Sequence, residues 1–181
     1  PAAAARGAMA RGWRCVWRAG RLGIAGRLLV KGLEAFLGLW KVKLLRELPS
    51  RNRVMKLGII EALGAIGDPW AVPSLLEILT GDESSEIRWA TALALGNTGD
   101  PAAIPALVQA LQDPDKYVRF GAATALGKLG WQPAGEDRAF LLIARQEWAS
   151  LPALGAGAVH PLLRAIRDQD PAIRARGVEA L

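Results

Sequence analysis

The sequence has 181 residues, a formal net charge of +6 and 51 % hydrophobic residues, enough apolar side chain to bury a core. Ala and Leu supply much of it, and both favour helix over strand because they lose little conformational freedom in a helix. The single cysteine, Cys15, excludes an intramolecular disulfide, so we expect a reducing compartment and a cytoplasmic location.

The charges are unevenly distributed along the chain. Residues 1–56 contain 13 Lys and Arg but only two acidic residues, a net charge of +11. Residues 57–181 contain 10 basic and 15 acidic residues, a net charge of −5. Such asymmetry predicts that the basic end contacts either an anionic surface or the acidic body of its own fold.

The basic end, residues 1–52, is predicted to be a Trp-containing helical segment that caps the rest of the chain. Charged residues interrupt its apolar runs, so a membrane-spanning helix is not expected. Its solvated cations can be purely structural, but two other hypotheses stay open. Residues 1–56 can contact an anionic membrane surface, with Trp side chains at the interface, or bind nucleic acid by neutralising phosphates. The candidate basic surface consists of Arg14, Arg18, Arg21, Arg27 and Lys31.

From residue 53 onward the sequence repeats. The string Ala-Leu-Gly ends at Gly64, Gly96 and Gly127, which are 32 and 31 residues apart, and a partial copy occupies 173–181. A single pair of short helices cannot bury its apolar face, so neighbouring pairs must stack. The sequence therefore predicts an all-α fold, an α-solenoid (superhelix) of stacked antiparallel helix pairs over residues 53–181. We expect the array to continue beyond residue 181.

Each repeat is predicted to contain two helices. In one repeat, apolar residues within 102–112 share a helical face, and those within 118–126 extend the stripe on a second helix. Gly-Asp-Pro at 99–101 should end one helix and start the next, because Gly adopts the left-handed conformation that closes a helix. Small Ala and Gly residues should let paired helices approach closely. Acidic residues recur in the turns and are predicted to cap helices and to pair with Arg88, Arg119 and Arg174: Asp68, Asp82, Asp100, Asp113, Asp168 and Asp170.

Residues 131–158 interrupt the spacing of the repeats and are predicted to be an insertion. We expect a loop, a helix near 136–150 and a return into the next repeat.

The repeated strings resemble a known family. Ile87-Arg88 followed by Ala-Leu-Gly and Gly-Asp-Pro, and the equivalent string from Asp113, resemble the short HEAT-like repeats first described in phycobilin lyases. The resemblance covers roughly residues 54–130 and 159–181 and implies a HEAT/armadillo-like solenoid. The same repeats occur in proteins without lyase activity. A phycobilin lyase-like enzyme or assembly factor is therefore one alternative that the resemblance implies.

No set of residues in the sequence indicates catalysis. One histidine, His160, and one cysteine cannot form a zinc site of the usual His and Cys composition. His160 precedes Pro161 at an expected helix start and is predicted to be structural or exposed. We therefore expect no catalytic residue, no metal, no cofactor and no small-molecule substrate.

A binding surface is predicted on the second helix of each repeat, which usually lines the concave face of such solenoids. Aromatic and Arg side chains dominate binding hot spots. Such a surface would suit a helix or extended segment of another protein, which favours protein–protein interaction or scaffolding as the function. The alternative is that Trp89 and Phe120 fill gaps between repeats. The candidate surface consists of Arg88, Trp89, Leu93, Arg119, Phe120, Thr124 and Lys128.

Overall fold

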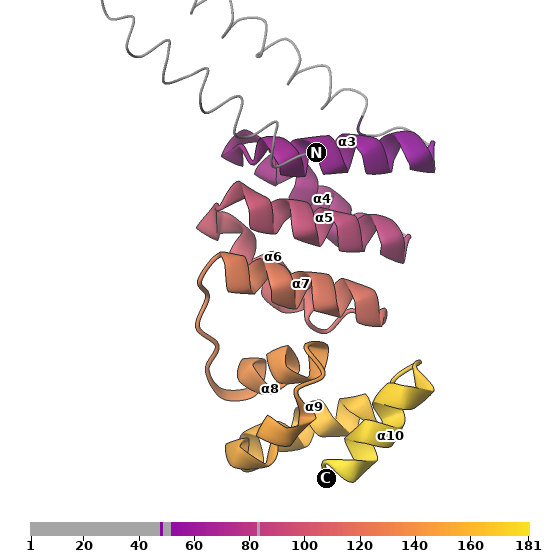
Figure 1. Ribbon diagram of the computed structural model, residues 1–181, viewed down its shortest axis with the longest axis vertical. Helices are drawn as coiled ribbons and strands as arrows, with labels where there is room; N and C mark the ends of the chain where they lie inside the picture. The colour runs from indigo at the N-terminus through magenta and orange to yellow at the C-terminus, as the bar shows by residue number, and fades with distance from the viewer. Residues whose placement is uncertain (1–47, 49–51, 83) are drawn as a thin grey trace, which may run out of the picture. The chain divides into compact units, whose positions relative to one another are not determined.

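The computed structural model describes Leu48 and residues 52–82 and 84–181. Contacts divide the chain into two units, Pro1–Pro49 and Ser50–Leu181, and the second contains every helix described below. Its described residues form eight α-helices and four short 3-10 helices, with no strand (Figure 1). The protein is an all-α solenoid of stacked helix pairs, as its sequence predicts.

The second helices of three repeats stack in one layer, which faces the viewer in Figure 1. They are α3 (Arg53–Ile66), α5 (Ser85–Thr98) and α7 (Lys116–Lys128). The first helices of two repeats, α4 (Val72–Gly81) and α6 (Ile104–Ala110), lie behind this layer, each packed against the second helix that follows it.

The Gly-Asp-Pro strings separate the repeats as predicted. Gly67 and Gly99 close α3 and α5 in the left-handed conformation, with φ of 66° and 71°. The aspartate that follows Gly99 accepts a hydrogen bond from the backbone N–H of Ala102 at 2.9 Å. Each string leads into a 3-10 turn, Pro69–Ala71 or Pro101–Ala103, before the first helix begins. The chain thus reverses direction within a few residues.

The second helices cross at the Ala-Leu-Gly strings. A Cβ on Gly96 would lie 2.6 Å from Cα of Ala125, and one on Gly64 would lie 2.9 Å from Cα of Ala94. Both separations are well below the ~3.5–4.0 Å of an optimal carbon contact. The repeated glycine is therefore required by the close approach of α3 to α5 and of α5 to α7.

The stacking changes after α7. A Cβ on Gly127 would meet the guanidinium of Arg145 at 2.9 Å, in the place where the previous repeats present another second helix. Arg145 follows α8 (Gly135–Ala144), which packs between α7 and α9 (Ala156–Ala165), while α10 (Pro171–Glu179) packs on α9. The array is therefore completed by an element that does not follow the repeat.

The helix of the insertion is shorter than predicted. The sequence favours a helix near 136–150, but α8 ends at Ala144 and Gln146 has a left-handed φ of 61°. Two 3-10 turns, Trp148–Ser150 and Pro152–Leu154, complete the connection. This part has an apolar core of its own, formed by Ala139, Leu142, Ile143, Leu151, Ala158, Leu162, Ala165 and Ile173.

Each turn between the two helices of a repeat is braced by an aspartate and an arginine six residues apart. Asp113 accepts a hydrogen bond from the N–H of Asp115 at 2.8 Å, and Nη1 of Arg119 donates to the carbonyl of Asp113 at 2.7 Å. The same bonds recur around Asp82 with Arg88 and around Asp168 with Arg174. Asp68, Asp100 and Asp170 cap helix starts as predicted, whereas Asp82, Asp113 and Asp168 accept hydrogen bonds from amides within the turns. The guanidinium of Arg174 donates to the backbone carbonyls of its own turn, and not to a carboxylate as predicted.

The turn aspartates also join successive repeats, because each pairs with a cation on the second helix of the preceding repeat. Lys56 pairs with Asp82 at 2.7 Å, Arg88 with Asp113 at 2.8 Å and Arg119 with Asp168 at 2.6 Å. We call this series the Arg–Asp ladder. Burial raises the pKa of the Asp82 carboxyl, but hydrogen bonds from Lys56 and the Ser84 amide, with the nearby positive charges, outweigh burial and hold it below its usual value.

Breaking the last step of the ladder should destabilise the protein. Both side chains of the Arg119–Asp168 pair are nearly buried, 8 % and 11 % exposed. Replacing Arg119 with Met leaves the Asp168 carboxylate without its charged partner, and we expect a loss of about 3 kcal/mol in the free energy of unfolding. Urea denaturation followed by circular dichroism measures it. Arg176→Met is the control, because the Arg176–Glu179 pair is 63 % exposed on both sides and is worth roughly 0.5 kcal/mol or less. Equal losses in both variants would contradict this role of the ladder.

Gly96→Ala should also destabilise the fold. The added methyl must push α5 away from the backbone of α7, which we expect to cost about 1–3 kcal/mol. Gly81→Ala provides a matched control, since no heavy atom lies within 4 Å of its added Cβ. That change should be neutral or stabilise by up to about 1 kcal/mol by restricting the unfolded chain. Thermal unfolding compares the two, and a stable Gly96→Ala variant would show that the helices are not in tight contact.

Candidate protein interface

Two members of the predicted binding surface lie inside the fold. Arg88 is held by Asp113, and the Arg88 side chain is only 14 % exposed. Arg119 is buried, with hydrogen bonds to the carbonyls of Asp113 and Pro114 besides its ion pair. Both guanidinium groups point along the ladder to the next turn. The expectation that these arginines line an open face is therefore corrected.

Trp89 both fills a gap between repeats and is exposed, which are the two alternatives that the sequence left open. A Cβ on Gly121 would lie 2.8 Å from Cδ1 of Trp89 and 3.4 Å from its Nε1, so the indole rests on the bare backbone of α7. The same side chain is 37 % exposed. One edge of Trp89 thus fills the gap between α5 and α7, and the rest faces solvent. The glycine at 121, where the preceding repeat has Ala90, is the sequence signal for this contact.

Phe120 is 50 % exposed on α7, at the place equivalent to Trp89 on α5. One turn further along α7, the Thr124 hydroxyl donates to the carbonyl of Phe120 at 2.9 Å. Nζ of Lys128 donates to Oδ1 of Asn97 at 2.8 Å and so bridges α7 to α5.

Sequence reasoning missed a third aromatic residue. Tyr117 is 61 % exposed on α7 and precedes Phe120 by three residues, a spacing that places two side chains side by side on a helix. Nζ of Lys116 lies 5.2 Å from the centre of the Tyr117 ring. Leu93, one turn from Trp89 on α5, is only partly exposed. We name Trp89, Leu93, Tyr117, Phe120, Thr124 and Lys128 the aromatic face.

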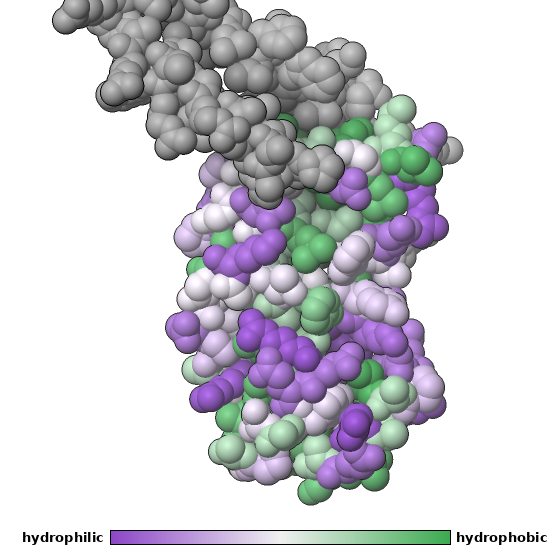
Figure 2. Space-filling model, in the orientation of Figure 1, coloured by the Kyte–Doolittle hydropathy of each residue, from purple (hydrophilic) through white to green (hydrophobic). Residues whose placement is uncertain are grey.

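The front of the described unit is not uniformly apolar. Figure 2 shows hydrophobic side chains interspersed with hydrophilic ones, and a broad hydrophilic band crosses the described unit, with mixed residues below it. The aromatic face itself contains the polar Thr124 and Lys128 beside its rings, and such a mixture is usual for a protein interface.

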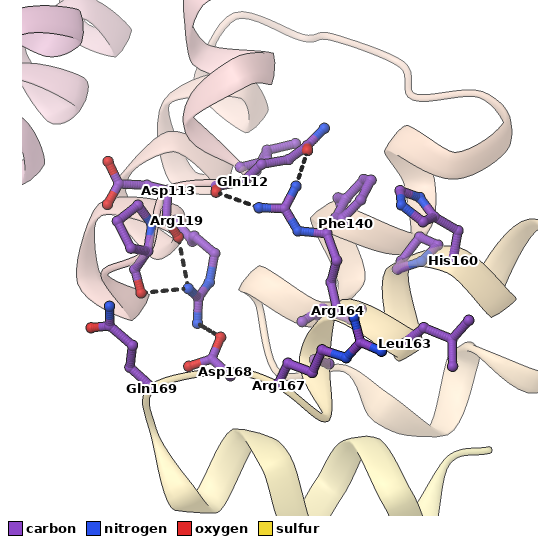
Figure 3. Close-up of a pocket in the computed structure, with 15 residues that line it drawn as sticks. Gln112, Asp113, Arg119, Phe140, His160, Leu163, Arg164, Arg167, Asp168 and Gln169 are labelled. Atoms are coloured by element: carbon purple, nitrogen blue, oxygen red, sulfur yellow. Dashed lines mark hydrogen bonds and ion pairs between the residues drawn. The ribbon is translucent and has the colours of Figure 1, made fainter.

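A second feature is an open pocket of about 500 Å³ between the α6–α7 turn and α9 (Figure 3). Sequence reasoning did not find it. Its cations Arg164 and Arg167 occupy places where the preceding repeat has Gln109 and Gln112, and this change of charge is the signal that was available. His160 lines the pocket but is exposed, with Nδ1 at 3.2 Å from a carboxylate oxygen of Glu136.

Residues that the sequence assigned to a basic surface, Arg14, Arg18, Arg21, Arg27 and Lys31, lie outside the described residues. In the described part of the chain, no group of three or more His, Cys, Asp or Glu side chains could hold a metal ion. Among the same residues, none of the helices has the length and apolar character needed to cross a membrane.

Comparison with known families finds HEAT repeats at residues 42–127 and 72–145, which together cover more than half of the chain. The chain belongs to the HEAT-repeat family. HEAT repeats generally mediate protein–protein interaction or scaffolding. A comparison with curated proteins gave no match.

The contact of Trp89 with Gly121 can be tested directly. In Gly121→Ala the new methyl must displace the indole, so we expect the Nε1–H resonance of Trp89 to shift in an NMR spectrum, assigned by Trp89→Phe. Gly58→Ala on α3 adds a methyl with no heavy atom within 4 Å of it and should leave that resonance in place. An unshifted resonance in Gly121→Ala would show that Trp89 does not rest on α7.

Proposed function

We propose that this protein is a non-catalytic interaction module that binds a segment of another protein across α5 and α7, on the aromatic face. The observation that carries the proposal is the exposure of three aromatic side chains, Trp89, Tyr117 and Phe120, on two helices that are packed tightly together. Exposed aromatic clusters with a polar rim are typical of protein-binding surfaces.

Packing between the helices supports this proposal energetically. α5 and α7 approach closely at Gly96, and Lys128 bridges them to Asn97, so the backbone beneath the aromatic rings is fixed before a partner arrives. Binding to a preorganised surface avoids part of the entropy cost of association. Complete burial of one aromatic side chain adds roughly 1.5–3 kcal/mol. A helix or an extended segment with apolar side chains is the partner that fits such a surface.

Finer assignments stay predictions. The Ala-Leu-Gly and Gly-Asp-Pro strings support the phycobilin-lyase type of repeat, and lyase-like activity or a role as an assembly factor rests on that resemblance alone. Binding of nucleic acid or an anionic membrane rests on the charge of residues 1–56. The cytoplasmic location rests on the single cysteine.

The aromatic face can be tested with a photo-crosslinking amino acid at Thr124. We expect it to capture a specific partner protein from the source cells, whose affinity for the purified full chain is then measured by calorimetry. Phe120→Ala should weaken that affinity about 30-fold, the effect of losing a hot spot of about 2 kcal/mol.

Val159→Ala is the control, because Val159 is an exposed apolar residue on α9, in another part of the unit. It should leave the affinity unchanged. If Phe120→Ala binds as tightly as the unmodified protein, the partner does not use the aromatic face.

A further inference from the structure

The pocket of Figure 3 exists because the insertion interrupts the repeat. Elsewhere a first helix packs directly beside the first helix of the next repeat, as α4 does with α6. After α6, the next first helix is α9, and α8 contributes Phe140 and Ile143 to the space between them. The resulting hollow of about 500 Å³ lies among the α6–α7 turn, α8 and α9.

Both carboxylates in the pocket lining are already paired. Asp113 is engaged by the Arg88 guanidinium through two hydrogen bonds at 2.8 and 2.9 Å. Asp168 is engaged by Arg119 at 2.6 Å. Because both carboxylates are already in ion pairs, they do not offset the charges of the two other cations of the lining, Arg164 and Arg167. The pocket is therefore locally positive, although residues 57–181 are net acidic.

The Arg164 guanidinium is held in position without being neutralised. It donates to the side-chain oxygen of Gln112 and, at 3.2 Å, to the backbone carbonyl of Gln112. Its central carbon lies 5.9 Å from the centre of the Phe140 ring, so the ring supports it from α8. Both partners are uncharged. Of the described residues, no carboxylate forms an ion pair with Arg164 or Arg167.

An apolar surface lies beside these cations. Leu163, which precedes Arg164, is 45 % exposed, and Phe140 forms part of the same wall. A single guanidinium can donate two parallel hydrogen bonds to the two oxygens of a carboxylate, and the apolar wall favours an aliphatic or aromatic side chain.

We propose that this pocket binds a partner peptide in which an apolar side chain is flanked by Asp or Glu, with the flanking carboxylates on Arg164 and Arg167 and the apolar side chain against Leu163 and Phe140. The proposal rests on the proposed function only in that the ligand belongs to another protein. An acidic segment of another protein suits this positive pocket better than residues 1–56, whose net charge is +11. Nucleic acid fits poorly, since only two unpaired cations face the pocket and two aspartates line it.

The experiment uses the full chain and an array of octapeptides in which Leu or Phe is flanked by Asp or Glu. A matched array carries Asn or Gln at the same places. We expect acidic peptides to bind and their amide counterparts to bind at least tenfold more weakly, with affinity that falls as salt is raised because salt screens the charges. Fluorescence anisotropy of the labelled best peptide gives the affinity.

Three charge-removing variants locate the binding. Arg164→Gln and Arg167→Gln should each weaken the acidic peptide about tenfold, the effect of losing one charged hydrogen bond. Arg138→Gln removes the same charge from an exposed residue of α8 outside the pocket lining and should have no effect. The Arg167 side chain is exposed and forms no hydrogen bond or ion pair with the described residues, so Arg167→Gln should change binding without changing stability.

Failure of this proposal can be told apart from failure of the proposed function. No saturable binding of any acidic peptide up to about 100 µM, a weak affinity by any standard, would overturn the pocket proposal. So would equal losses in Arg138→Gln and Arg167→Gln, or equal binding of acidic and amide peptides. None of these results touches the aromatic face, which is judged by Phe120→Ala.

Discussion

The Arg–Asp ladder is the interaction on which the arrangement of this solenoid depends. In a repeat protein each unit contacts only its neighbours, so the geometry of the array is set by the joints between successive units. Here one arginine stabilises both its own turn and the joint to the next repeat. Arg119 donates a hydrogen bond to the carbonyl of Asp113 in its own turn and pairs with Asp168 in the next turn. A side chain with five donors in a fixed fork can satisfy both demands at once, which a lysine cannot.

The ladder explains how the stacking of repeats continues past the insertion at residues 131–158. After α7 the contact between second helices is replaced by Arg145 lying against Gly127, and α8 enters between α7 and α9. Yet the Arg119–Asp168 pair joins the same two kinds of turn as Arg88 and Asp113 do one repeat earlier. The turn-to-turn joint is thus kept, while the close packing of second helices is reduced to an ion pair between Lys116 of α7 and Asp170, the N-cap of α10. The pocket of Figure 3 lies beside the Arg119–Asp168 pair, which joins the two repeats but does not fill the space between their first helices.

Much of this fold can be predicted from the sequence, because helix ends, turns and close helix contacts each require particular residue types. The left-handed glycine at Gly99, the capping aspartates and the small residue at Gly96 each satisfy a constraint within one repeat or between identical repeats. The recurrence of turn aspartates predicts that Arg88 and Arg119 pair with them, but it does not say whether each arginine reaches its own turn or the turn of the next repeat. That choice depends on the distance to an aspartate 25 or 49 residues further along the chain. Likewise, the early end of α8 at Ala144 depends on packing within its own small core.

The proposed pocket shows why net charge is a poor guide to what this surface attracts. Residues 57–181 carry five more acidic than basic residues, which by itself predicts repulsion of an acidic peptide. Most of the acids that line the turns, however, accept hydrogen bonds or pair within the ladder, and charges farther than about 10 Å away are screened at moderate salt. What a ligand meets at the pocket is set by the two nearest guanidinium groups, Arg164 and Arg167. The ladder therefore not only joins the repeats but also neutralises the aspartates that would otherwise cancel these cations.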